Sequence, residues 1–309
     1  MYDVRYLARK YDFDPRAVEK ACRACDILEG ISSDLFLRQR LSLYGGTALT
    51  LIHFDELRRL SVDLDFNYRH VDELDWGEVR SKVDEHLKRM LQLLRYTDLR
   101  VDASYPLGRI TIRYVNSFGL PDRLNTEVGY MRRFPILKKD TLADFLHLGR
   151  ERKVKILSPT REELFANKLI ACLHRRYARD VYDVARIGSL RFDGDVMRKC
   201  AVVESLMQKG MRLDKIEPNE ILRTVNLDDA LRNLLRKDIA ASLDFDEVKR
   251  EAVAVCESVT GGLTEGELHL IKKFHEDRRF EPELIDAGEF HEKLREHPAI
   301  NWVLREMVS

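Results

Sequence analysis

The pattern of apolar and polar positions divides the chain into two parts. Up to residue 157, two segments with helical periodicity (1–40 and 77–96) are interspersed with short stretches in which apolar and polar residues alternate. These stretches predict strands at 41–44, 62–66, 99–103, 109–116, 125–130 and 154–157. Beyond residue 158, helical spacing predicts helices at 161–173, 195–210, 219–224, 227–235, 245–259, 264–277 and 282–294. We therefore predict an α+β fold, with an N-terminal domain (1–157) on a mixed sheet and a C-terminal helical bundle (158–309).

Three sequences are typical of helix N-termini. Asp14 precedes a proline, which gives an N-cap followed by a residue suited to the first helical turn. Thr160 and Glu163 have the spacing of a capping box, in which each side chain binds the backbone N–H of the other residue, and Thr264 and Glu267 repeat that spacing. We expect a helix to begin at each of these points.

The candidate chemistry lies in the stretch 43–66. Gly45 and Gly46 end a short apolar segment and precede Thr47 and the helical pattern ALTLIHF, which predicts a strand, a tight turn and a helix. Glycines let the backbone turn sharply and approach a ligand closely, and the N–H groups at the start of a helix favour an anion. A phosphate fits this turn.

Asp63 and Asp65 follow on the next predicted strand. The two-residue period of a strand places both carboxylates on one face, where their repulsion is relieved by a divalent cation such as Mg²⁺ or Mn²⁺. Either feature alone is common on protein surfaces, but a phosphate turn followed by paired carboxylates is a layout for phosphoryl transfer.

These residues resemble the signature of the polymerase-beta-type nucleotidyltransferases, a Gly-Gly or Gly-Ser pair followed by Asp-x-Asp. The form GGTALTL, then R-x-S-x-D-L-D-F, is most similar to the AbiEii/AbiGii toxin branch. The resemblance implies a polymerase-beta-like nucleotidyltransferase domain in which Asp63 and Asp65 are catalytic and hold the metal. It also implies a set of nucleotide-binding residues: Gly45, Gly46, Thr47 and Ser61.

Glu127 is the candidate for a third metal ligand. It lies on the predicted strand 125–130, with Thr126 and Val128 on the opposite face. The resemblance supports this role, since the superfamily completes its metal site from a following strand. Asn125 stands where the family often has a lysine, so a surface glutamate remains the alternative.

A second motif follows in the helical part. The residues that match the toxin family are Glu163, Leu164, Lys168, Leu169, Arg176, Asp180 and Asp183. The resemblance implies that Lys168 and Asp183 bind the nucleotide, with Lys168 at the triphosphate, and that Asp180 is a catalytic general base. The alternative for Asp180 is a surface ion pair with Arg176, four residues earlier.

Composition adds limits to this interpretation. The 309 residues contain 53 Lys and Arg against 53 Asp and Glu, so the net charge is zero and nucleic-acid binding needs a local patch. One basic cluster follows the sheet (Arg132, Arg133, Lys138 and Lys139) and is either such a patch or a charged loop. We expect no membrane span and a cytoplasmic protein, because no apolar run approaches the ~20 residues of a spanning helix. Five cysteines fit a reducing compartment, and we expect a structural role for Cys22 and Cys25.

The sequence therefore predicts a Mg²⁺-dependent nucleotidyltransferase that moves NMP from an NTP to an acceptor. The resemblance implies a toxin with a cognate antitoxin and RNA, such as a tRNA, as the acceptor. Two alternatives stay open: transfer to a protein or a small molecule, and a nucleotide-binding partner protein without turnover. A helical DNA-binding protein is disfavoured by the zero net charge and the lack of a recognition-helix signature.

Overall fold

The computed structural model describes residues 2–71, 75–104 and 106–307, which form two compact units. Unit 1 consists of Met1–Arg133, Asp140–Pro159 and Arg232–Leu243, and unit 2 of Phe134–Lys139, Thr160–Leu231 and Asp244–Ser309. The chain thus passes between the units several times, whereas our prediction divides it once, after residue 157. That single division stays a prediction.

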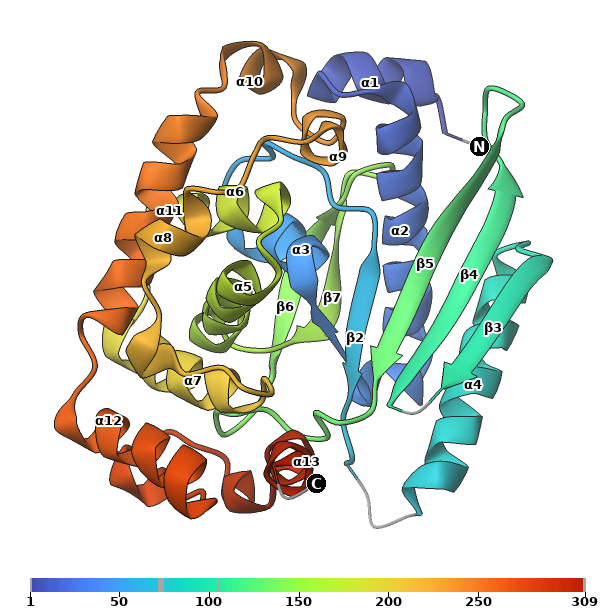
Figure 1. Ribbon diagram of the computed structural model, residues 1–309. Coiled ribbons are helices and arrows are strands. Elements are labelled where there is room, and N and C mark those ends of the chain that lie inside the picture. The colour runs from blue at the N-terminus through green and yellow to red at the C-terminus, as the bar shows by residue number, and fades with distance from the viewer. Residues whose placement is uncertain (1, 72–74, 105, 308–309) are drawn as a thin grey trace. The chain divides into compact units, whose positions relative to one another are not determined.

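A mixed five-stranded sheet forms the centre of unit 1, as predicted (Figure 1). Its strands, in spatial order, are β1 (Leu41–Tyr44), β2 (Leu64–Tyr68), β5 (Pro121–Gly129), β4 (Leu107–Val115) and β3 (Asp98–Ser104). Strands β2 and β5 are parallel, and the other neighbours are antiparallel. The parallel pair brings the strand after the Gly-Gly turn beside the strand that carries Glu127.

Helices cover this sheet. Those of unit 1 are α1 (Val4–Tyr11), α2 (Pro15–Ser33), the short α3 (Gly45–Ala48), α4 (Trp76–Leu93) and α10 (Lys237–Ser242). Helices α2 and α4 contact each other and lie behind the strands in Figure 1. Asp14 caps α2 as predicted, because its carboxylate accepts the backbone N–H groups of Arg16 and Ala17 at 2.9 and 3.2 Å.

A second hairpin in unit 1 pairs β6 (Thr141–His147) with β7 (Arg152–Ser158). Strand β7 was predicted in part, but β6 was not. In the sequence of β6, apolar and polar residues do not alternate. Leu142 and Leu146 are apolar although the structure leaves them 59% and 45% exposed. The hairpin is fixed to β1 by the hydroxyl of Ser158, which donates to the carbonyl of Leu43 at 3.1 Å.

Helices make up unit 2. They are α5 (Arg161–Arg175), α6 (Ala178–Ile187), α7 (Gly194–Leu206), α8 (Pro218–Leu222), α11 (Phe245–Thr260), α12 (Glu265–Lys272) and α13 (Pro298–Glu306), and α9 (Asp229–Arg232) ends where the chain returns to unit 1. The capping box at Thr264 and Glu267 is confirmed. The one at Thr160 is wrong, because the Glu163 carboxylate instead accepts the N–H groups of Ile136 and Leu137 at 3.0 and 3.1 Å.

The predicted helix at 282–294 is also wrong. The segment contains only two single 3-10 turns, Pro282–Leu284 and Leu294–Glu296. Between them the Asp286 carboxylate accepts three successive backbone N–H groups, and Gly288 has a φ of 95°, which no helix contains. A local side-chain turn therefore replaces the helix, despite the apolar spacing.

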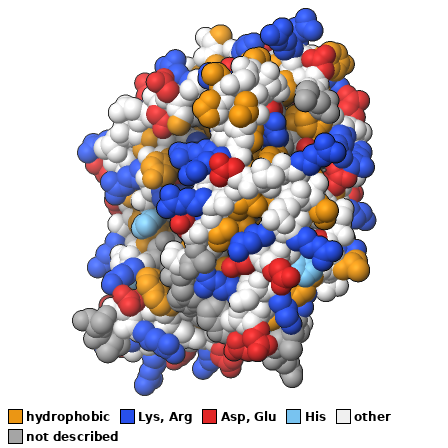
Figure 2. Space-filling model, turned by 90° about the vertical axis from the view of Figure 1, so that its right-hand side faces the viewer, with side chains coloured by type: hydrophobic (Ala, Val, Ile, Leu, Met, Phe, Trp, Pro, Cys, Tyr) orange, Lys and Arg blue, Asp and Glu red, His pale blue; other side chains and the backbone are white. Residues whose placement is uncertain are grey.

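The surface charges are mixed and the cysteines are unpaired, as the composition suggests. Basic and acidic side chains are scattered together over the face seen in Figure 2. All five cysteines are buried and free, and burial raises the pKa of Cys22 and of Cys25 to about 12, so both thiols are inert packing groups. None of the helices in the described ranges has the length and apolar content needed to cross a bilayer.

Candidate active site

The Gly-Gly turn lies directly at the end of β1. Gly45 has a φ of 72°, a left-handed conformation that glycine adopts without strain, and α3 begins there. The helix is shorter than predicted, since α3 passes after Ala48 into a π-helical turn over Leu49–His53. Strand, turn and helix are therefore all present in the predicted order.

Asp65 lies against this turn. It pairs with Tyr44 in the β1–β2 register, and a Cβ placed on Gly45 would come within 2.5 Å of its Oδ2 atom. Ser61 lies against the second glycine in the same way, since a Cβ on Gly46 would be 2.9 Å from its hydroxyl. The structure thus brings together Gly45, Gly46, Ser61 and Asp65, and both glycines are required by close contact.

Thr47 and Asp63 are joined by a hydrogen bond. The Thr47 hydroxyl donates to the backbone carbonyl of Asp63 at 2.6 Å, and the Thr47 side chain is buried. Asp63 lies one residue before β2 and is half-buried. The threonine therefore fixes the segment that carries the first aspartate, and its hydroxyl is already engaged inside the protein.

Glu127 lies beside Asp65 on the neighbouring strand. The two residues are partners in the parallel β2–β5 register, which places both side chains on one face of the sheet. Glu127 also has a cation of its own, because the Arg109 Nε atom on β4 lies 2.7 Å from its carboxylate. Binding a metal would require Glu127 to share or exchange this arginine.

The donor set fits a divalent metal at Asp63 and Asp65. Both supply hard carboxylate oxygens, Asp65 lies against the glycine turn, and a third carboxylate, that of Glu127, adjoins Asp65 in the sheet. The three do not, however, form a closed cluster: within the described ranges, only the ligand atoms of Asp26, Glu29 and His147 come within 4.8 Å of one another as a group of three.

That other cluster is an ion-pair network rather than a metal site. Arg150 binds both of its carboxylates at 2.7 and 3.2 Å, and Arg152 also binds Glu29. His147 is fully buried with both ring nitrogens engaged, since Nδ1 accepts the Gly149 N–H and Nε2 lies 3.2 Å from Asp26. Burial raises the pKa of Asp26, but hydrogen bonds from His147 and Tyr2 outweigh it and leave this pKa lowered. The network ties α2 to the β6–β7 hairpin.

The second motif forms a compact buried cluster within unit 2. Lys168 on α5 places its Nζ atom 2.9 Å from Asp180 and 3.1 Å from Asp183, both on α6. The two aspartates are fully buried, and the lysine side chain is 7% exposed. A second cation, Arg175, lies 3.2 Å from Asp180, so this carboxylate contacts both Lys168 and Arg175.

This cluster excludes the alternative considered for Asp180. Asp180 does not form a surface ion pair with Arg176, because Arg176 is the exposed residue that ends α5 and Asp180 turns inward to Lys168 and Arg175. Arg175 lies at the very end of α5 and contacts the first turn of α6. Its role depends on how the chain reverses between the helices, which the spacing of the motif does not reveal.

Sequence reasoning also gave no role to Arg59. It is among the largest fully buried side chains, and its Nη2 atom would be 2.7 Å from a Cβ on Gly46. Its Nη1 donates to the carbonyl of Leu60 at 2.8 Å. Because the arginine stands two residues before Ser61 in R-x-S-x-D-L-D-F, that spacing was the available signal.

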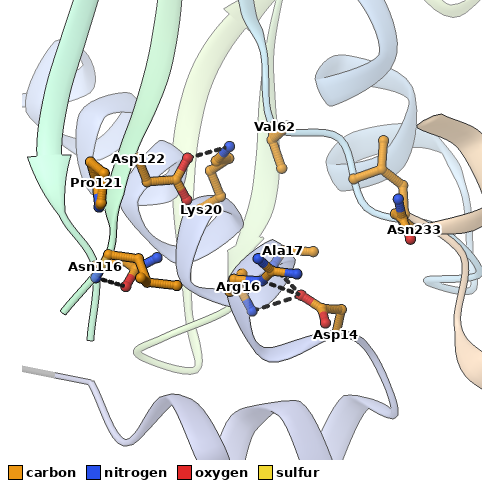
Figure 3. A pocket seen from close by; sticks show the side chains of 11 residues that line it. Asp14, Arg16, Ala17, Lys20, Val62, Asn116, Pro121, Asp122 and Asn233 are labelled. Atoms are coloured by element: carbon orange, nitrogen blue, oxygen red, sulfur yellow. Dashed lines mark hydrogen bonds and ion pairs between the residues drawn. The ribbon is translucent and has the colours of Figure 1, made fainter. Parts of the chain in front are cut away.

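A cavity of about 310 Å³ lies elsewhere in unit 1 (Figure 3). It adjoins Val62, the residue before Asp63, and is crossed by the ion pair of Lys20 with Asp122 at 2.7 Å. Its lining contains two acidic and two basic side chains. None of the predicted site residues lines it, so this cavity is separate from the glycine turn.

A glycine turn against an Asp-x-Asp strand on a mixed sheet defines a nucleotidyltransferase. MenT4, a nucleotidyltransferase toxin from Mycobacterium tuberculosis H37Rv, has a solved structure that matches 99% of both chains with a TM-score of 0.64 at 16% identity, which establishes the shared fold. The family model "Nucleotidyl transferase AbiEii toxin, Type IV TA system" matches residues 26–255.

The chain therefore belongs to the AbiEii nucleotidyltransferase toxin family of type IV toxin-antitoxin systems. This confirms the resemblance drawn from the motifs and makes the protein a transferase. Membership implies an NTP substrate and an antitoxin partner. No curated protein matches the chain significantly.

Proposed function

We propose that this nucleotidyltransferase transfers NMP from an NTP to RNA, with a tRNA as the leading acceptor, in the cytoplasm. The observation that carries the proposal is the contact of Asp65 with the Gly45 turn, because it sets a carboxylate beside a backbone loop that accepts phosphate. The RNA acceptor follows from the family resemblance and from the toxin function of the family.

Three carboxylates are proposed to hold the metal. Asp63 and Asp65 bind Mg²⁺ or Mn²⁺, and Glu127 completes the site when its ion pair with Arg109 breaks. When bound, the metal supplies positive charge at the phosphates. The proposed nucleotide contacts of this unit are Gly45, Gly46, Thr47 and Ser61. Because the Thr47 hydroxyl already donates to Asp63, we propose that Thr47 contacts the nucleotide through its backbone N–H.

The buried cluster of unit 2 is proposed to complete the chemistry. Lys168 and Asp183 contribute to nucleotide binding, and Lys168 exchanges one carboxylate for a phosphate oxygen. Asp180 takes the proton of the acceptor hydroxyl as that oxygen bonds to the α-phosphorus and pyrophosphate leaves. One observation supports this role: the Asp180 Oδ2 atom is buried and accepts no hydrogen bond from the described residues, although Arg175 lies 3.2 Å away.

The test supplies the purified protein with Mg²⁺, each α-labelled NTP in turn, and total cellular RNA. Asp63→Asn is assayed in parallel, with Asp98→Asn as the matched control, since Asp98 is a 61% exposed carboxylate on β3 of the same unit. We expect label in tRNA-sized RNA with the wild type and the control and none with Asp63→Asn. Thermal unfolding confirms that the variants are folded.

Other results would reject the proposal. Label in a protein or a small molecule instead of RNA would identify a different acceptor. Binding of NTP with Mg²⁺, without pyrophosphate release for any acceptor, would indicate a silent nucleotide-binding protein. Full activity of Asp63→Asn would remove this aspartate from the metal site.

A further inference from the structure

An exposed basic segment connects α5 to α6. We name residues 174–179 the basic turn; it contains His174, Arg175, Arg176, Tyr177 and Arg179. Residues 174–177 are all exposed, and the Tyr177 ring is 50% exposed although aromatic rings usually pack inside. The turn carries three arginines and no acidic residue, whereas the whole chain has equal numbers of acidic and basic residues.

Two guanidinium groups of the basic turn lie near the tyrosine. The Cζ atom of Arg175 lies 5.9 Å from the centroid of the Tyr177 ring, and that of Arg179 lies 5.7 Å from it. Arg175 also pairs with the buried Asp180, which ties the turn to the cluster of Lys168. Two cations therefore lie close to the tyrosine, while half of its surface faces solvent.

Arg176 has an unusual backbone for its side chain. It ends α5 with a φ of 60°, the left-handed position that glycine normally occupies at a helix C-terminus. An arginine there strains the backbone and adds an exposed cation next to Tyr177 in the sequence.

We propose that the basic turn binds an unpaired nucleotide at the end of the RNA acceptor. Its base stacks on Tyr177, and the flanking phosphates bind Arg175 and Arg176. Exposed aromatics with nearby guanidinium groups are how proteins hold single-stranded RNA, whereas bases inside a duplex are not available for stacking. This inference rests on the proposed RNA acceptor and adds the surface that receives it.

The experiment measures binding of a fluorescent single-stranded oligoribonucleotide of about ten nucleotides by anisotropy, in the full-length protein. We expect Tyr177→Ala to weaken binding about 5- to 150-fold, the range found when a stacked aromatic is removed, and Tyr177→Phe to keep wild-type affinity. Arg176→Gly, which relieves the strained backbone, should remain folded and lower the salt slope of binding by about 0.7.

Tyr6 offers the matched control, because it is a 52% exposed tyrosine outside the basic turn, on α1 of unit 1. Tyr6→Ala should bind RNA like the wild type, and NTP binding without RNA should be unchanged in Tyr177→Ala. If both variants still transfer NMP to RNA, and Tyr177→Ala has the same RNA affinity and the same KM for RNA as Tyr6→Ala, the inference is overturned and the RNA acceptor is retained. Wild-type transfer to a protein or a small molecule alone would instead overturn the RNA acceptor, and this inference with it.

Discussion

Gly45→Ala is the most direct perturbation of the site. A Cβ at this position would lie 2.5 Å from the Asp65 Oδ2 atom, so the carboxylate must move about 0.9 Å to reach an ordinary contact of 3.4 Å. A displacement of about 1 Å at a reacting group lowers activity by roughly 100-fold. The φ of 72° adds a backbone cost of about 1–2 kcal/mol in stability.

Gly119 separates these two effects. Its φ is 77°, and a Cβ there would meet no atom within 4 Å. Gly119→Ala should therefore lose the same stability of about 1–2 kcal/mol but keep activity within about 2-fold. The assay is NMP transfer under single-turnover conditions, with thermal unfolding of both variants alongside. Equal activities of the two variants would show that the contact of Asp65 with the turn has no part in catalysis.

Three further predictions concern charges outside this turn. Lys168→Met removes the cation that bridges two buried carboxylates and should cost about 3–5 kcal/mol in thermal unfolding. Lys209→Met, whose ion pair is exposed, should cost at most about 1 kcal/mol, and similar losses for the two variants would contradict the buried cluster. Burial and a neighbouring guanidinium lower the pKa of His275, so the folded state binds this proton less readily than the unfolded state. The free energy of unfolding should therefore fall as the pH drops below 6.5, the usual pKa of histidine. In His275→Gln the melting temperature should depend less on pH. Arg109→Ala should lower the Mg²⁺ concentration for half-maximal activity if Glu127 is a ligand, and an unchanged Mg²⁺ titration would leave Glu127 outside the site.

The local order of the sheet was predictable because its signals are short in range. Two glycines between an apolar segment and a helical pattern are enough to place the turn, and two-residue alternation places Asp65. The pairing of Asp65 with Glu127 depends on the parallel register of β2 and β5, which lie some sixty residues apart in the chain. That register comes from packing across the whole sheet.

The charge partners were not predictable for a related reason. Arg109 meets Glu127 through the β4–β5 register, and Arg175 meets Asp180 through the reversal between two helices. The alternative pairing of Asp180 with Arg176 assumes one continuous helix, in which residues four apart are neighbours. The helix predicted at 282–294 failed in the same manner, because a single Asp286 carboxylate offered the backbone a competing set of hydrogen bonds.

Zero net charge limits how this protein can hold RNA. With 53 basic and 53 acidic residues, the molecule has no overall field to draw a polyanion, so affinity must come from a local surface. Arg175 and Arg176, the two arginines proposed to bind phosphates, would neutralise about two phosphates, which corresponds to a salt slope of roughly −1.4 for single-stranded RNA. So shallow a slope leaves stacking on Tyr177 as the main source of affinity at physiological salt. A slope steeper than about −4 would mean that further cations, such as those of the cluster at residues 132–139, also contact the RNA.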